Sequence, residues 1–287
     1  MRASDIIPDP GLIDELTGLV SRAAAAILAV RTGGALAPRI KADATPVTGA
    51  DEASEAVILA GLRRALPGIA VVSEEAGAPP QLKGGDFVLV DPLDGTRELI
   101  AGRDEFCINL AVVCGGRPRL GIIGAPALGL VWRTAADAGA ERLHLAPGAG
   151  ASAASERTGI RPRRWPSAGA GAVAAVSRLH LDVRTRAFLA RLPEVEEIAS
   201  GSAIKLCRVA EGSADVYPRL APVNQWDIAA GDAILTAAGG AVTTPKGAPL
   251  TYGPGAGGYL VPGFIAWGDA AAADRLGLGK DQGGSSR

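Results

Sequence analysis

The chain has 287 residues and a formal net charge of −1, because 29 Lys and Arg residues stand against 30 Asp and Glu. A chain of this length forms one large domain or two modest ones, and its 48% hydrophobic content suffices for a sizeable core. The balanced charge lacks the overall basic field of a protein that binds nucleic-acid polymers, so any function that depends on charge must be local.

Cysteine usage and hydropathy favour a cytoplasmic protein. Cys107, Cys114 and Cys207 form no CxxC pair and are odd in number, which argues against a disulfide framework. The apolar run at 23–30 is far shorter than the roughly 20 residues that span a bilayer. We therefore expect no signal peptide and no membrane span. Peripheral association with the inner membrane and a homodimer are left open.

Two helices are expected at the start of the chain. Apolar residues recur at helical spacing over 11–31, and a Gly-Gly pair follows. A second amphipathic helix is expected within 45–68, where Thr48 and Asp51 have the spacing of a capping box. In that role Asp51 stabilises the helix by about 1 kcal/mol.

Strands are expected next. The runs 69–75 and 87–95 are short, apolar and β-branched, and each breaks into an acid-rich turn. The segment 106–135 contains apolar runs joined by short Gly- and Pro-containing turns, which predicts antiparallel strands. Together with the two helices, these strands indicate an α+β first half.

The composition of the middle of the chain predicts a connection. Residues 146–172 are rich in Gly, Ala, Ser and Pro. We therefore expect an N-terminal α+β subdomain over 1–145 and a C-terminal α/β subdomain over 173–287.

Three elements are expected in the C-terminal part. Residues 172–177 are typical of a strand, and residues 182–192 are typical of a helix. A further helix is expected over 226–240, with Asp227 near its start and a Gly-Gly pair at its end.

Acidic residues gather where these elements begin or end: Asp51, Glu74, Glu75, Asp91, Asp94 and Asp227. If they converge, their mutual repulsion prevents all of them from staying ionised unless cations lie between them. Carboxylate oxygens without neighbouring His or Cys suit a hard ion such as Mg²⁺, which is held by carboxylates, waters and substrate phosphate. A magnesium-dependent phosphatase is the resulting hypothesis.

Simpler interpretations of single acids remain open. Asp94 lies in the turn-forming sequence "DPLDGT" and could cap a helix that begins near Thr96. Asp227 could likewise be a plain N-cap. Glu75 is expected to be a solvated neighbour of the site rather than a ligand.

Four segments resemble the signature sequences of the inositol monophosphatase superfamily: "VTGADEASEAVI", "VVSEEAG", "DPLDGTRELI" and "NQWDIAAGDAIL". Their order, spacing and residue types agree across most of the chain. Two further stretches, "KADATPVTGAD" and "SGSAIKLCRVAEGSADVYPRLAPVNQWDIAAGDAIL", resemble the 3′(2′),5′-bisphosphate nucleotidases of the CysQ type more than the inositol enzymes.

The resemblance implies a fold and a reaction. The fold is a layered α+β sandwich of two subdomains, as in inositol monophosphatase and fructose 1,6-bisphosphatase. The reaction is Mg²⁺-dependent hydrolysis of a phosphomonoester, with adenosine 3′,5′-bisphosphate converted to AMP and phosphate. The alternatives are inositol monophosphatase, more distantly fructose 1,6-bisphosphatase, and a non-catalytic binding protein on the same fold.

The resemblance also implies roles for individual residues. Two or three Mg²⁺ ions would be held by Glu74, Asp91, the carbonyl of Leu93, Asp94 and Asp227. Glu74 would also position the attacking water, and Thr96, hydrogen-bonded to Asp51, would act on that water as part of a general base. Substrate contacts are expected from Leu93, Asp94, Gly95, Thr96, Gly201, Ser202, Lys205, Arg219 and Asp227.

Arg219 is expected to help choose the substrate. The resemblance places a glutamate that accepts sugar hydroxyls at this point of the inositol enzymes, whereas an arginine can only donate and suits a second phosphate. Lys205 could add a point charge. The alternative for Arg219 is a surface ion pair. The related nucleotidases often have Ser-Ser where this chain has Ser202 and Ala203, so a hydroxyl contact with the nucleotide is in doubt.

Overall fold

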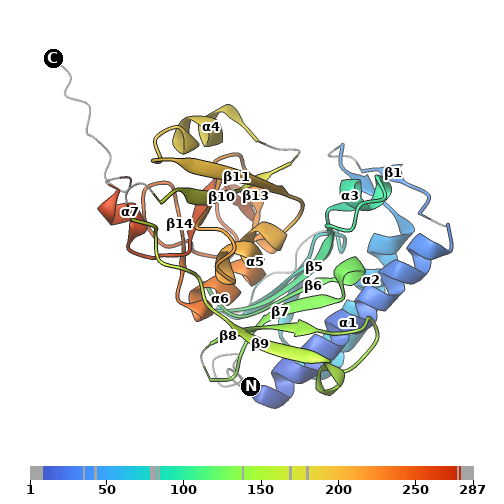
Figure 1. The fold of residues 1–287 in the computed structure, drawn as a ribbon. Coiled ribbons are helices and arrows are strands. Elements are labelled where there is room, and N and C mark those ends of the chain that lie inside the picture. Colours follow the sequence, from blue (N-terminus) through green and yellow to red (C-terminus); the bar gives the residue numbers. More distant parts are fainter. Residues whose placement is uncertain are drawn as a thin grey trace.

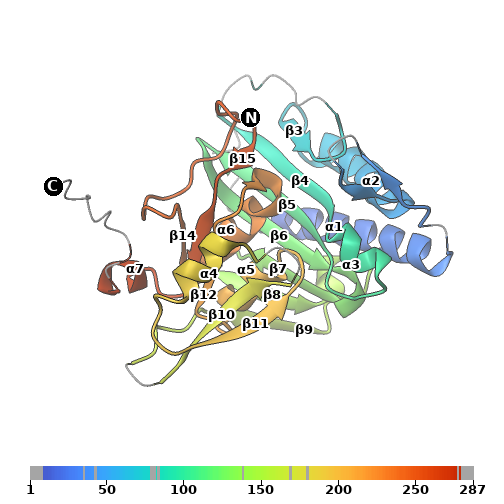
Figure 2. The ribbon, with the colours of Figure 1, turned by 90° about the horizontal axis from the view of Figure 1, so that it is seen from above.

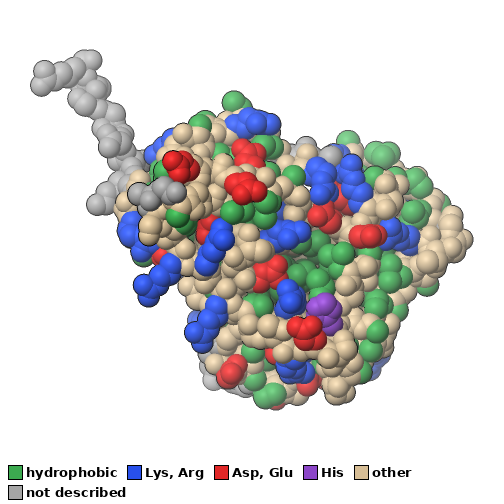
Figure 3. Space-filling view, in the orientation of Figure 1, with side chains coloured by type: hydrophobic (Ala, Val, Ile, Leu, Met, Phe, Trp, Pro, Cys, Tyr) green, Lys and Arg blue, Asp and Glu red, His purple; other side chains and the backbone are tan. Residues whose placement is uncertain are grey.

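Two mixed β-sheets, separated and flanked by helices, make up the structure, so the expected layered α+β architecture is confirmed (Figure 1). The computed structural model describes residues 9–34, 36–41, 44–77, 82, 85–137, 139–167, 170–178, 181–276 and 278. Within these residues no helix is long and apolar enough to cross a membrane. Basic and acidic side chains are interspersed over the face seen in Figure 3, in keeping with the balanced charge.

The larger sheet has seven strands in the order of the chain. The first pair is parallel and every later pair is antiparallel, so the antiparallel strands expected within 106–135 are confirmed. The strands are β3 (Ala70–Ser73), β4 (Phe87–Asp94), β5 (Cys107–Cys114), β6 (Arg117–Ala125), β7 (Leu130–Thr134), β8 (Ala140–His144) and β9 (Glu156–Ile160).

Two helices cover one face of this sheet, α1 (Pro10–Thr32) and α2 (Gly49–Ala65) (Figure 2). The expected capping box at the start of α2 is present, because Thr48 and Asp51 each accept a backbone N–H of the first turn. The apolar stripe of α1 packs with α2 and the sheet in one buried cluster. A short hairpin of β1 (Arg39–Ile40) and β2 (Pro46–Val47) joins the helices.

Helices α5 (Ile204–Ala210) and α6 (Ala229–Ala238) lie between the two sheets. Gly121 of β6 lets α6 approach closely, since a Cβ there would come within 2.2 Å of the Ala230 carbonyl oxygen. The core around α5 and α6 contains residues of both sheets, for example Ala111 and Phe264. The two halves of the chain therefore share one core.

The smaller sheet has the strand order β11, β10, β12, β16, β14. An outer apolar cluster that includes Phe188 and Ala272 packs on its far side. The strands of this sheet and the two helices on its far side are β10 (Ala172–Ser177), α4 (Val183–Leu189), β11 (Val195–Ser200), β12 (Val216–Arg219), β14 (Ala241–Thr243), β16 (Phe264–Trp267) and α7 (Ala272–Arg275). The described residues also contain a two-stranded ribbon and short 3₁₀ turns: β13 (Val223–Asn224), β15 (Leu260–Val261), η2 (Pro126–Leu128), η3 (Ala151–Ala153) and η4 (Gln225–Asp227).

The stretch expected to be a connection, 146–172, contains a strand of the larger sheet. β9 pairs with β8 over its whole length, and Ile160 at its end is buried. The chain therefore leaves the larger sheet only after Ile160. We call residues 9–160 the first half and residues 161–278 the second half. The domain boundaries expected from the sequence stay predictions.

Candidate active site

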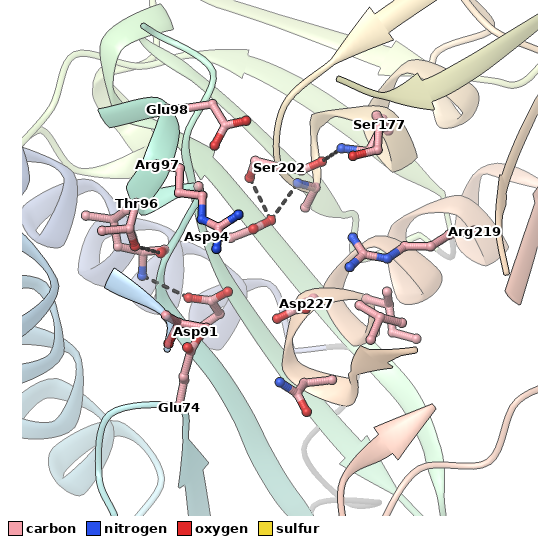
Figure 4. A pocket seen from close by; sticks show the side chains of 18 of the residues that line it. Glu74, Asp91, Asp94, Thr96, Arg97, Glu98, Ser177, Ser202, Arg219 and Asp227 are labelled. Carbon is pink, nitrogen blue, oxygen red and sulfur yellow. Dashed lines mark hydrogen bonds between the residues drawn. The ribbon is translucent and has the colours of Figure 1, made fainter. Parts of the chain in front are cut away.

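A cavity of about 290 Å³ lies between the two halves. Its wall in the first half comes from the end of β4 and from α3 (Thr96–Ile100), and its wall in the second half comes from α5, β12 and η4. Figure 4 shows that the acids of the first half and Arg219 of the second half approach this space from opposite sides.

The irregular end of β4 directs two acids toward the cavity. In a regular strand, residues three apart point to opposite faces of the sheet. The pairing of β4 with β5 shifts register between Asp91 and Asp94, and such an irregularity changes the direction of a side chain. Both acids therefore line the same cavity.

Glu74, Asp91 and Asp227 form a compact group of carboxylates. Glu74 follows β3, which runs parallel to β4, and its N–H donates to the Val90 carbonyl at 3.1 Å. Asp227 comes from η4 in the second half. One oxygen from each of the three carboxylates lies within 4.8 Å of the others.

Burial and proximity make this group electrostatically unfavourable by itself. Asp91 is 1% exposed. Burial, and then the neighbouring carboxylates, hold the pKa of Asp91 and of Asp227 well above the usual range, and the same causes raise the pKa of Glu74. A divalent cation would remove both the repulsion and the desolvation cost, because it places positive charge between the oxygens.

The donor atoms of this group fit Mg²⁺. They are carboxylate oxygens, and Leu93 lines the same cavity. Hard cations prefer such all-oxygen sites, in which solvent and substrate complete the coordination. The residues present therefore suit the ion that the sequence predicted.

Asp94 lies near this group but is bound mainly to the second half. Its Oδ2 accepts the Ser202 hydroxyl and the Ala203 N–H, both at 2.7 Å (Figure 4). Among the described residues it is not part of the 4.8 Å group. Its expected role as a metal ligand stays a prediction.

The simpler interpretations of Asp94 and Asp227 as helix caps are wrong. The N-cap of α3 is Gly95, and no side chain caps this helix. The N-cap of α6 is Ile228, again without a side-chain hydrogen bond. Gly95 has φ +98°, and a Cβ there would lie 3.2 Å from the Glu105 carbonyl oxygen, so this turn requires glycine.

Asp51 uses its two oxygens for different purposes. Oδ2 accepts the Thr48 N–H at 2.8 Å and the Thr48 hydroxyl at 2.7 Å, which completes the capping box. Oδ1 accepts the Thr96 hydroxyl at 3.0 Å. The capping role and the contact with Thr96 therefore coexist.

The basic residues of the second half differ in what they contact. Lys205 is 2% exposed, and its Nζ donates to the Ser202 carbonyl at 2.5 Å and to the Ser200 carbonyl at 3.2 Å. Its charge therefore supports the backbone beside the cavity. Arg219 lines the cavity next to Asp227, and its buried Nε has no partner among the described residues. This position does not fit a surface ion pair.

Lys41 is a neighbour of the site that sequence reasoning missed. Its Nζ lies 2.7 Å from Glu74 and 2.8 Å from Glu75. The expectation that Glu75 is a solvated neighbour is wrong, since its side chain is only 12% exposed and is ion-paired. A lysine 33 residues before Glu74 has no local spacing that reveals the contact. Other cavity residues that sequence reasoning missed are Arg97, Glu98, Ser177, Tyr217 and Asn224.

The comparison with known proteins agrees with this geometry. A model of the inositol monophosphatase family matches residues 12–273. The chain belongs to this family. Membership accounts for the layered fold and for the order of the acidic segments along the chain.

Relatives within the family point to the nucleotidase branch. The 3′(2′),5′-bisphosphate nucleotidase CysQ of Escherichia coli K12 is 36% identical over 256 residues, which are 88% of this chain and 98% of the relative. A histidinol-phosphatase of Mycobacterium tuberculosis is 32% identical over 222 residues, which are 71% of this chain and 77% of the relative.

Solved structures of the family share the fold. CysQ from Bacteroides thetaiotaomicron has a TM-score of 0.74 and 30% identity, and the match covers 91% of this chain and 98% of that one. An inositol monophosphatase of Thermotoga maritima has a TM-score of 0.69 at 24% identity, with 91% and 93% covered. The second likeness supports the fold alone.

Proposed function

We propose that the protein is a Mg²⁺-dependent 3′(2′),5′-bisphosphate nucleotidase, which converts adenosine 3′,5′-bisphosphate to AMP and phosphate. The observation that carries the proposal is the cavity in which the Glu74, Asp91 and Asp227 carboxylates meet, with Arg219 facing Glu74 and Asp91 from the opposite side (Figure 4). The carboxylates suit cations that bind the reacting phosphate, and Arg219 offers a donor to a second anionic group. The 36% identity to a CysQ nucleotidase supports the same substrate.

Glu74, Asp91, Asp94, Asp227 and the Leu93 carbonyl would hold two or three Mg²⁺ ions. When bound, these ions would neutralise the phosphoryl charge and favour ionisation of the attacking water. Calorimetric titration with Mg²⁺ would give the number of ions.

Asp51 and Thr96 would together act as the general base that removes a proton from the attacking water. Thr96 Oγ1 donates to Asp51 Oδ1 at 3.0 Å, so it would take a proton from a water in the cavity as its own proton passes to Asp51. Glu74 would position this water from the other side. The first-turn N–H groups of Gly95 and Thr96 would donate to the phosphate.

Arg219 would recognise the second phosphate. Its guanidinium lies in the cavity beside Asp227, and it can only donate hydrogen bonds. A phosphate oxygen is a better partner for this fork than a sugar hydroxyl. Lys205 would contribute through the backbone of Ser202, which its ammonium holds in place.

The proposed function is tested by phosphate release from a substrate panel. We expect adenosine 3′,5′-bisphosphate to exceed inositol 1-phosphate, fructose 1,6-bisphosphate and histidinol phosphate in kcat/KM by at least about tenfold. We expect a chelator to abolish turnover and Mg²⁺ to restore it. Higher activity on inositol 1-phosphate would favour the inositol enzyme, and absence of turnover on every substrate would favour a binding protein.

The role of Arg219 is tested by Arg219→Gln. Glutamine is a better choice than glutamate, since a new carboxylate beside Asp227 would also disturb cation binding. We expect kcat/KM for the bisphosphate to fall at least about tenfold, or about 1.4 kcal/mol, with residual hydrolysis of inositol 1-phosphate unaffected. Arg184→Gln, at an exposed arginine of the same half, is the matched control.

We also infer a cytoplasmic location, supported by three free and buried cysteines at positions 107, 114 and 207. The homodimer stays a prediction, which light scattering of the purified protein would test.

A further inference from the structure

The four residues that connect β11 to α5 in the second half, 200–203, are held beside the cavity by carboxylates of the first half. Asp94 accepts two hydrogen bonds from them, as described above. Glu105, which precedes β5, accepts the Gly201 N–H on its Oε2 at 3.0 Å. We call residues 200–203 the clamp loop. Glu105 lies outside the acidic segments that the sequence singles out.

The contact between Glu105 and the clamp loop is tight. A Cβ on Gly201 would lie 2.7 Å from the Glu105 carbonyl oxygen and 3.0 Å from Glu98 Cγ. The same carbonyl oxygen also packs against Gly95, where a Cβ would lie 3.2 Å from it. Glu105 is therefore wedged between the glycine that precedes α3 and the glycine of the clamp loop.

The clamp loop needs such support because its backbone is strained. Ser202 has φ +52°, a region that costs a residue with a Cβ about 1 kcal/mol or more. The second half also holds the loop from its own side, through the two Lys205 bonds and through Arg208 Nε, which donates to Ser200 Oγ at 2.8 Å.

Glu105 is suited to an ionic role in this contact. It forms an ion pair with Arg178, which lies directly after β10 in the second half. Burial by itself would raise the pKa of Glu105, but the bonds from Arg178 and Gly201 hold the pKa below its usual range. The carboxylate is therefore charged at neutral pH and accepts from two parts of the second half.

We propose that Glu105 is a positioning residue for substrate recognition: it fixes the clamp loop so that Ser202 and Ala203 line the cavity. The proposal rests on the proposed function, in which the backbone of Ser202 belongs to the substrate site. Glu105 touches neither the substrate nor the reacting atoms. Glu105 acts on substrate binding through the position of the clamp loop. Its substitution should therefore change KM and leave kcat nearly unchanged.

The test compares Glu105→Ala and Glu105→Gln with a matched control. Asp104→Ala is suitable, because Asp104 is the preceding residue and also pairs with an arginine, Arg31, at 2.8 Å, but within the first half. Each protein is assayed with Mg²⁺ on adenosine 3′,5′-bisphosphate. Hydrogen exchange of the backbone amides at 200–204 and the melting temperature are measured in parallel.

For Glu105→Ala we expect KM to rise at least about tenfold while kcat changes less than about threefold. Exchange at the Gly201 amide should accelerate at least about tenfold, because its acceptor is gone. Glu105→Gln should recover most of the protection, since an amide oxygen still accepts this N–H. Asp104→Ala should leave KM and the exchange of the Gly201 amide unchanged, although its melting temperature should change about as much as that of Glu105→Ala.

A second variant keeps the test decisive. Gly201→Ala forces a Cβ against Glu105 and should raise KM by a similar factor. If the two substitutions disturb the same contact, KM of the double variant should be little higher than KM of either single variant. Additive effects, unchanged exchange in Glu105→Ala, or an equal rise of KM in Asp104→Ala would overturn the proposal.

The experiments distinguish a wrong nucleotidase assignment from a wrong assignment of Glu105. Absence of bisphosphate hydrolysis by the unmodified protein would remove the nucleotidase assignment. The exchange measurements need no substrate and would still show whether Glu105 holds the loop.

Discussion

Two buried aspartates in this protein, Asp215 and Asp91, have opposite electrostatic surroundings. Asp215 is 1% exposed and accepts Arg163 Nε, Arg163 NH2 and the Val173 N–H, each at 2.6 Å. Asp91 is equally buried, yet its neighbours are two further carboxylates. The same side chain at the same burial is thus ion-paired in one place, while in the other it lies among carboxylates that a cation would neutralise.

The largest effect is expected from Asp91→Asn. Turnover should fall at least about a thousandfold, because an amide cannot neutralise the cations that the phosphate requires. The free energy of unfolding of the metal-free protein should not fall, since one repelling charge is removed. Steady-state kinetics and denaturation in chelator measure the two quantities. Near-normal activity would refute the assignment of Asp91 as a ligand.

At the ion pair of Arg163 and Asp215 we expect a loss of stability without a loss of activity. Arg163→Leu should lower the free energy of unfolding by about 3 kcal/mol, because it leaves the buried Asp215 carboxylate without its counter-charge. Specific activity of the folded fraction should stay within about threefold. Urea denaturation and kinetics at low temperature check this, and a loss below about 1 kcal/mol would show that Asp215 is hydrated in solution.

The carboxylates around Asp91 should also make the stability of the metal-free protein depend on pH. The folded pKa of Asp91 is raised above its ordinary value of 3.8, so its stabilising contribution is complete below about pH 4 and is lost as pH rises through the folded pKa. The metal-free protein should therefore lose up to about 1.4 kcal/mol per pH unit per such group as pH rises. Melting curves in chelator should show this loss, and Mg²⁺ should reverse it.

Two variants calibrate that experiment. Asp91→Asn should flatten the loss of stability with rising pH. Burial raises the pKa of Asp232 to about 6, although Tyr252 and Thr236 donate to it, so Asp232→Asn should change the curve only between about pH 4 and pH 7. Identical curves for both variants and the unmodified protein would show that neither carboxyl is perturbed.

The smallest loss of stability is expected at the capping box, where Asp51 both caps α2 and contacts Thr96. Thr48→Ala removes a capping contact and should cost about 1 kcal/mol of stability with kcat changed less than about threefold. Asp51→Asn should instead lower kcat by about a hundredfold, through Thr96. Equal loss of kcat in both variants would show that the contact with Thr96 only supports the helix.

Much of the first half was predictable because its signals are local. The capping box at Thr48, the end of α1 before Gly33 and the strands β3 and β4 follow from residues close in sequence. β9 was missed, because Gly, Ala, Ser and Pro around it resemble a linker and only its pairing with β8 makes it a strand. Likewise, the helix expected from 226 begins at Ala229, since η4 turns Asp227 toward the cavity.

The chemistry of the site follows from residue types and their local order. Residue type fixes that Glu74, Asp91 and Asp227 offer hard oxygen donors, and local spacing fixes that they stand at the ends of elements. Which side chains meet depends on how the elements pack. The contacts of Lys41 with Glu74 and of Glu105 with Gly201 join residues 33 and 96 positions apart. Lys41 and Glu74 meet within the first half, whereas Glu105 and Gly201 meet because the two sheets share one core around α6. No local pattern carries either kind of information.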